Sequence, residues 1–201
     1  MSKIARAYRE APKNVPSGVA PGHRVADVGT GEVVVFLIGM RVNRWRRVRS
    51  WFPVFVAMPR MLAELAKNPD LGLLSARSYW SGRVLVTVQY WRSVEELGRF
   101  AKDPSLTHAP AWAAFNRRAA STGDIGIWHE TYRVPADQVE TLYGNMPTFG
   151  LGAALGAVER AGGRRNATHE RMGSTRPEYV ETPLECGDGL GRRQRSGRRA
   201  P

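Results

Sequence analysis

Cysteine is nearly absent from this chain of 201 residues, since the single one, Cys186, lies near the C-terminus. One thiol excludes a disulfide within the chain and a cysteine-based metal site. Long apolar runs are also missing: the longest, 33-VVVFLIGM-40, is much shorter than the roughly 20 residues that span a bilayer. The first residues, MSKIARAYREAPKNV, contain no apolar stretch of signal-peptide length. These absences predict a soluble protein of the reducing cytoplasm.

Acidic residues are scarce, because 18 Asp and Glu accompany 30 Lys and Arg, for a formal net charge of +12. This excess favours anionic partners without choosing between nucleic acid, a membrane surface and an acidic small molecule. No GxGxxG turn follows a predicted strand, and no nucleophile elbow or phosphate-binding loop is present. The 4 histidines and the other potential ligands do not stand at metal-ligand spacing, so no zinc or other non-haem metal site is predicted.

The composition divides the chain into three parts. Residues 1–30 contain scattered prolines and no periodicity, which predicts an extended N-terminal arm. Residues 31–155 hold nearly all the periodic apolar sequence and are long enough to bury a core. Residues 156–201 are rich in Gly and Arg and end in GLGRRQRSGRRAP, which predicts a basic, disordered tail without specific nucleic-acid recognition.

Strand-like and helix-like patterns alternate in the central part. The predicted strands are 33–40, 71–80, 83–91 and 124–134, with a further edge segment at 138–146. The predicted helices are 53–67, in which Pro59 indicates a kink or restart, and 93–120, interrupted at Asp103-Pro104. Ser93 and Glu96 form a capping box at the start of the second helix, and Ser81-Gly82 is a hairpin turn.

This order of elements is typical of an α+β fold, the ferredoxin-like split βαβ sheet. The helices would cover one face of the sheet and leave the other apolar face exposed. Because proteins rarely tolerate such a face, we expect a second copy to cover it, giving a homodimer and a dimeric α+β barrel. The pocket of such a barrel lies between the sheet and the helices.

The strongest candidate residue for function is His129, in 125-IGIWHETY-132. Alternation places it on the same strand face as Ile127 and Thr131, where an imidazole needs a partner. That partner is a backbone carbonyl, a substrate or a metal. A single histidine can bind haem iron axially, although it cannot hold a catalytic zinc alone.

Weaker candidates are polar residues in otherwise apolar surroundings. Gln89 alternates with Thr87 on a strand and either meets solvent or lines the pocket. His108 either faces the pocket or begins a helix on the surface, and Asn145 either orients a substrate or forms a turn.

The basic segment 41-RVNRWRRVRS-50 is read first as a solvated loop. Its Arg44 and Arg47 could hold haem propionates or an acidic group of a substrate. Because tryptophans accompany the arginines, the alternatives are binding of nucleic acid and binding of an anionic membrane surface.

Several blocks of the sequence resemble a bacterial and fungal family related to the antibiotic-biosynthesis monooxygenases, best known from the fumagillin pathway. The matching blocks are 33-VVVFLIGMRVNRW-45, 89-QYWRSVEEL-97, 108-HAPAWAAFNRR-118, 127-IWHETY-132 and 145-NMPTFGL-151. The resemblance covers roughly residues 30–155. It implies a monooxygenase-like oxidoreductase that acts on a small hydrophobic substrate in specialised metabolism.

The sequence is more distantly similar to haem-containing aldoxime dehydratases, through Tyr90-Trp91-Arg92-Ser93, Thr107-His108 and His129-Glu130-Thr131. This likeness implies that His129 is the axial ligand of haem b. Met146-Pro147 stands where those enzymes have Cys-His, so their acid–base histidine has no counterpart.

The sequence therefore supports a haem-dependent monooxygenase-like enzyme as the first hypothesis. The alternatives are a cofactor-independent barrel monooxygenase and a haem-dependent dehydratase, a lyase, acting on a nitrogen-containing substrate. A non-enzymatic alternative is a basic module that binds a ligand or a polyanion.

Overall fold

The computed structural model describes residues 15–118 and 120–159. Its strands are β1 (Ala20–Ala26), β2 (Glu32–Val42), β3 (Leu73–Ser81), β4 (Val84–Trp91), β5 (Ile125–Pro135), β6 (Tyr143–Met146) and β7 (Ala157–Glu159). Its helices are α2 (Val48–Lys67), α3 (Val94–Lys102), α4 (His108–Arg118) and α5 (Gly150–Leu155), with 3-10 turns η2 (Pro69–Leu71) and η3 (Ala136–Gln138).

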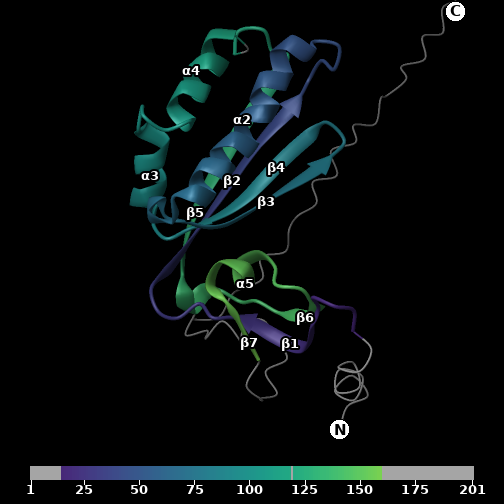
Figure 1. Ribbon diagram of the computed structural model, residues 1–201, viewed down its shortest axis with the longest axis vertical. Coiled ribbons are helices and arrows are strands. Elements are labelled where there is room, and N and C mark those ends of the chain that lie inside the picture. Colours follow the sequence, from purple (N-terminus) through teal and green to yellow (C-terminus); the bar gives the residue numbers. More distant parts are fainter. Residues whose placement is uncertain (1–14, 119, 160–201) are drawn as a thin grey trace, which may run out of the picture.

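The main sheet has the strand order β3-β4-β2-β5, and all its pairs are antiparallel. Helices α2, α3 and α4 lie together on one face of this sheet (Figure 1). This arrangement confirms the predicted α+β class and its split βαβ order. Within the described residues the sheet is open at β3 and β5 and does not close into a barrel by itself.

A second, smaller sheet has the order β6-β1-β7 and packs with α5 at one end of the molecule (Figure 1). Two predictions made from the sequence differ from the structure in this region. The segment predicted as an extended arm contains β1, and the predicted edge segment 138–146 contributes β6 to this sheet and not to the main one. The chain leaves the main sheet at Pro135, the end of β5, and continues into η3, where the Ala136 N–H donates to the Gly31 carbonyl oxygen at 2.8 Å. The predicted tail, apart from residues 156–159, lies outside the described residues.

Helix α2 starts at Val48, five residues before the predicted start, and it continues through Pro53 and Pro59. Both prolines are exposed, so their rings do not disturb the side that packs. Met61 and Leu65 are buried on that side. Tertiary packing therefore outweighs the lost backbone donors, as it does for most helices in proteins.

The predicted turn and cap of the central part are confirmed. The hydroxyl of Ser93 accepts a hydrogen bond from the backbone N–H of Glu96 at 3.1 Å, as expected at the start of α3. Gly82 has a φ of +55° in the hairpin between β3 and β4, a conformation that favours glycine.

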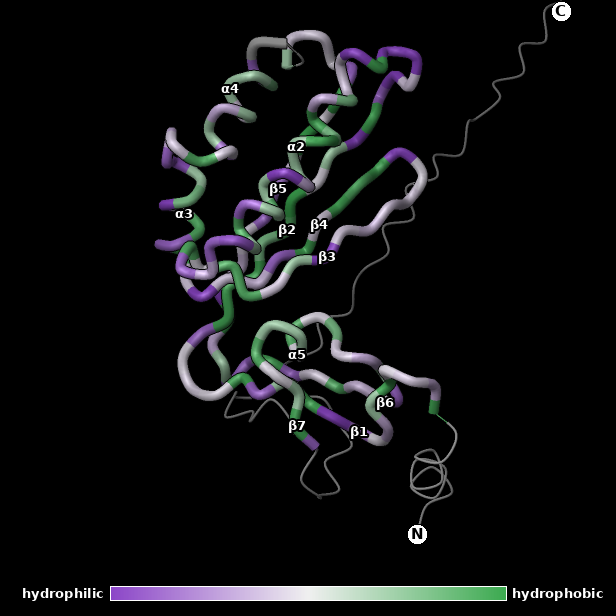
Figure 2. Tube along the Cα trace, in the orientation of Figure 1, coloured by the Kyte–Doolittle hydropathy of each residue, from purple (hydrophilic) through white to green (hydrophobic). Residues whose placement is uncertain are grey.

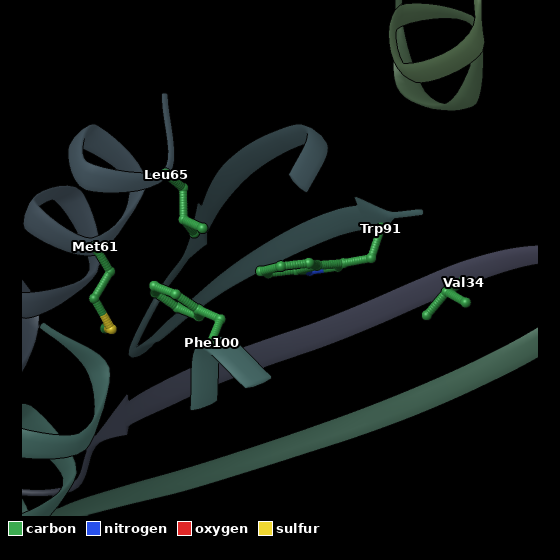
Figure 3. Packing of buried hydrophobic residues seen from close by; sticks show 5 residues of the cluster. All are labelled: Val34, Met61, Leu65, Trp91 and Phe100. Carbon is green, nitrogen blue, oxygen red and sulfur yellow. The ribbon is translucent and has the colours of Figure 1, made fainter. Parts of the chain in front are cut away.

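The core between the sheet and the helices contains Val34, Met61, Leu65, Trp91 and Phe100, which gather in Figure 3. The rings of Trp91 and Phe100 lie 5.8 Å apart between centroids. Apolar residues follow β2 and β4, whereas the hairpin tip and the loop before α2 are hydrophilic (Figure 2). This core packs the sheet against α2 and α3.

Candidate functional site

A cavity of about 910 Å³ lies between the main sheet and the helices. Most of its wall is apolar. The sheet contributes Phe36, Ile38, Met40, Leu85 and Ile127, and the helices contribute Val54, Ala57, Met58, Met61, Leu97, Ala111, Ala114 and Phe115. This volume is near the upper end of the ~300–1,000 Å³ found for pockets that hold drug-sized ligands.

Strand alternation explains which sheet residues reach this cavity. Ile38 of β2 pairs with Thr87 of β4 on one side and with His129 of β5 on the other. Because side chains directly opposite each other share a face, these three point toward the helices. The neighbours Trp128 and Glu130 therefore point to the other face, as the sequence predicted.

His129 lies on the cavity wall at the edge strand of the sheet. Its ring packs against Phe36, with 5.7 Å between centroids and a tilt of 43°. Within the described residues neither ring nitrogen makes a hydrogen bond. The His129 side chain is exposed, and not buried among isoleucines as predicted. Its position on the cavity wall leaves it accessible to a ligand.

His108 also lines the cavity, from the first turn of α4. Its Nδ1 lies 2.9 Å from the carbonyl oxygen of Ala101, and because a carbonyl only accepts, Nδ1 carries the proton and donates. The ring packs beside Phe100 at 5.8 Å. This bond fixes the tautomer and leaves Nε2 without a proton when the ring is neutral.

The other two polar candidates lie away from the cavity wall. Gln89 is 4% exposed, and its Oε1 accepts a hydrogen bond from Trp91 Nε1 at 2.9 Å. Asn145 is in β6 of the small sheet, has a φ of +49°, and accepts a hydrogen bond from the Gly22 N–H at 2.9 Å. Both side chains hold neighbouring structure in place.

Arg44 and Arg47 do not line the cavity either. Arg44 Nη1 forms an ion pair with Asp124 Oδ1 at 2.9 Å, and the Ser50 hydroxyl donates to the other carboxylate oxygen at 2.8 Å. The hydrogen bond from Ser50, and then that from Arg44, lowers the pKa of Asp124 below its usual value. This cluster anchors the loop before α2 to the start of β5.

Two arginines that line the cavity, Arg49 and Arg60, were not among the predicted site residues, although Arg49 belongs to the predicted basic segment 41–50. Both belong to α2, whose N-terminal turn was read as a loop, so the shared helical face of the two was not visible. The signal was the spacing of eleven residues, which returns to nearly the same side of a helix after three turns.

The described part of the chain contains no group of three or more His, Cys, Asp or Glu side chains that could hold a metal ion. Over the same residues, no helix combines the length and apolar character needed to cross a membrane. The potential nitrogen ligands of a metal ion on the described cavity wall are two separate imidazoles, His129 on the sheet and His108 on α4.

Two solved structures share the fold of this chain. An aldoxime dehydratase is 24% identical with a TM-score of 0.52 and covers 61% of this chain and 38% of its own. The aldoxime dehydratase OxdRE in complex with butyraldoxime is 18% identical with a TM-score of 0.55 and covers 67% of this chain and 39% of its own. At these identities the likeness shows the fold alone.

Monooxygenase af470 of Aspergillus fumigatus is 29% identical over 156 residues, or 73% of this chain. The chain spans about half the length of that relative, 54%. Residues 33–151 match the family described as Monooxygenase af470-like. The match contains the main sheet and the helices α2, α3 and α4 that cover it, apart from Glu32, the first residue of β2. Because this match covers more than half of the chain, the protein belongs to the monooxygenase af470-like family.

Proposed function

We propose that this chain forms the substrate-binding unit of a cytoplasmic, monooxygenase-type oxidoreductase of specialised metabolism. Its substrate is a small hydrophobic molecule bound between the main sheet and α2 and α4, and haem b is the cofactor. The observation that carries this proposal is the imidazole of His129, on the wall of a largely apolar cavity with both nitrogens free of hydrogen bonds within the described residues.

The residues present fit a haem group. His129 offers a nitrogen ligand, and the Phe36 ring beside it limits the rotation of the imidazole. The apolar walls between the sheet and the helices suit a flat macrocycle. When bound there through one histidine, haem supplies oxygen and redox chemistry, while the protein supplies the ligand, the shape and the surroundings.

His108 is the second residue with a proposed role. Its Nδ1–H is held by the Ala101 carbonyl, so Nε2 is available to accept a proton from a substrate in the cavity. A general base has to lie within hydrogen-bond distance of the proton that it removes. Because His108 lines the cavity, a substrate bound there can come within this distance of Nε2. Gln89 and Asn145 act in this proposal as supports of the fold.

The test is reconstitution of the purified chain with haemin, followed by absorbance spectroscopy. We expect a Soret band that shifts on binding and is lost or strongly reduced in His129→Ala. Thr131→Ala is the matched control, because Thr131 lies on the same strand face two residues away. A folded wild-type protein that leaves the Soret band of free haemin unshifted, or an identical spectrum for His129→Ala, would contradict haem ligation by His129.

A cofactor-independent monooxygenase is the second candidate, and the geometry of His108 favours it. If an electron-rich substrate reacts directly with oxygen, a neutral imidazole with Nε2 free is a suitable base. Turnover by protein freed of haem, and its loss in His108→Gln, would support this candidate. Formation of a nitrile from butyraldoxime would instead support the dehydratase alternative, and salt-sensitive polyanion binding unchanged by His129→Ala would support a non-enzymatic module.

A further inference from the structure

Most hydroxyl groups on the cavity wall already have partners. The Thr87 and Ser78 hydroxyls lie 2.8 Å apart, and the Thr107 hydroxyl donates to the Glu64 carboxylate at 2.5 Å. These bonds are made within the protein and do not need a ligand. The groups left for a ligand are therefore few, and they are mainly nitrogen donors.

Arg49 and Arg60 are the charged residues on the wall. Both are exposed, and within the described residues neither guanidinium makes an ion pair or a hydrogen bond. They lie on nearly the same side of α2, about 16 Å apart along the helix axis. The helix thus presents two unpaired cations along one side of the cavity mouth.

Among the described residues that line the cavity, none is an aspartate or glutamate. Elsewhere in the described fold, three arginines form ion pairs with carboxylates: Arg44 with Asp124, Arg92 with Glu96, and Arg133 with Glu32. Within the described residues Arg49 and Arg60 lack such a partner although they border an apolar space, so a carboxylate on a ligand could accept hydrogen bonds from either guanidinium.

The packing of α2 on the sheet places these arginines on either side of the level of His129. Near the start of α2, Val54 packs with Met40, and further along the helix Ala57 and Met58 pack in the cluster that contains Phe36. Ile38, the cross-strand partner of His129, lies between Met40 and Phe36 on β2. A ligand beside His129 therefore has a guanidinium toward each end.

We propose that the cavity binds an apolar ligand that carries a carboxylate, and that Arg49 or Arg60 holds this carboxylate at the mouth. Two sources have this chemistry, a porphyrin with its propionates and a free hydrophobic carboxylic acid. The inference rests on the proposed function in using the same cavity, but it does not require His129 to bind iron. It moves the anion-binding role from the predicted Arg44 and Arg47 to residues that line the cavity.

The test compares acids with their neutral esters as ligands. Fluorescence titrations would use protoporphyrin IX against its dimethyl ester and cis-parinaric acid against its methyl ester. We expect the wild type to prefer the acid in one of these pairs by about tenfold, the scale of a charge-assisted hydrogen bond. The pair that shows the preference identifies the source, porphyrin or free acid. Iron-free porphyrin keeps this result independent of the Soret test.

The double variant Arg49→Gln/Arg60→Gln should bind acid and ester equally, and the single variants should show which arginine holds the carboxylate. The matched control is Arg46→Gln/Arg99→Gln, which removes the same charge from exposed arginines outside the cavity and should keep the preference. Far-ultraviolet circular dichroism confirms that each variant is folded. Equal binding of acid and ester by the wild type, binding of none of the probes, or a preference retained by Arg49→Gln/Arg60→Gln overturns the proposal.

Discussion

Asp124 shows how a single carboxylate can secure the edge of the cavity. It is 4% exposed, and next to the start of β5 it binds Arg44 in the loop before α2 and Ser50 in the first turn of α2. Because these hydrogen bonds lower its pKa, the folded state binds the proton less tightly than the unfolded chain does. The stabilisation is complete above the ordinary carboxyl pKa of 3.8 and disappears as the pH falls through the lower pKa of the folded state.

We therefore predict that Asp124→Asn lowers stability at neutral pH and flattens the loss of stability on acidification below about pH 4. Urea unfolding at a series of pH values measures both effects. Asp137→Asn is the control, since Asp137 is exposed in η3. Equal pH profiles for Asp124→Asn and the wild type would contradict the role of this carboxylate.

Gly39 is required by a close approach on the other face of the sheet. A Cβ atom at this position would lie 2.5 Å from Trp128 Nε1 and 2.9 Å from the carbonyl oxygen of Leu85. We predict that Gly39→Ala destabilises the fold by about 1–3 kcal/mol, the usual cost of overpacking. Gly98→Ala is the opposite case, because nothing lies within 4 Å in α3, and it should stabilise by roughly 0.5–1 kcal/mol. Thermal unfolding of both variants tests this contrast.

At the residue scale, the sequence predicted correctly the directions of side chains that depend only on alternation along a strand. It predicted that the side chains of His129 and Trp128 point to opposite faces of the sheet, and the register of β5 on β2 agrees. It did not predict the partners of Gln89 and Asn145. Trp91 Nε1 lies two residues away on the same face of β4, so alternation could have indicated it, whereas the Gly22 N–H comes into reach of Asn145 only through tertiary structure. A polar residue in an apolar strand therefore signals a hydrogen bond, without saying whether its partner is protein or ligand.

The helices show where local signals succeed and where packing overrides them. The start of α3 was predictable because the capping residue Ser93 acts within one turn. The start of α2 was not, because Pro53 is typical of a first helical turn and so predicted a start there, whereas the helix begins five residues earlier, at Val48. The strands β6 and β7 are short, and pairing with distant β1 determines them more than their own sequence does.

At this scale we predict that Ser93→Ala lowers the free energy of unfolding by about 1 kcal/mol, because the Glu96 N–H loses its acceptor. Ser93→Asp should keep most of the stability, since a carboxylate also accepts this bond. Denaturant titration of the two variants separates the cap from a general effect of substitution. Equal losses for Ala and Asp would show that the cap contributes little.

At the scale of the whole molecule, the face of the main sheet opposite the helices is only partly covered. The small sheet and α5 pack against one end of it, near Val35 and Tyr90. Burial, and then the nearby Tyr143 and Tyr79, raises the pKa of Tyr90 there. On the same face of the edge strand β5, Trp128 and Tyr132 remain exposed. An exposed apolar face of this kind favours a second copy as its cover, so we propose a homodimer.

We predict that the wild type is a dimer at micromolar concentration and that Val86→Glu, in the centre of this face, makes it a monomer. Light scattering coupled to size-exclusion chromatography measures the mass. Val158→Arg changes an exposed apolar residue of the small sheet and should leave the dimer intact. A monomeric wild type would argue against the paired barrel.

The small sheet also bears on where this chain can be shortened. The family match starts at residue 33, yet β1, the middle strand between β6 and β7, ends at Ala26. A protein cut to residues 33–151 would keep β6 but lose β1 and β7, the two other strands of its sheet, and with them Ala26, which packs in one cluster with Leu151 and Tyr143. Expression trials that shorten the chain should therefore keep residues 15–159, so that β1, β6 and β7 stay together.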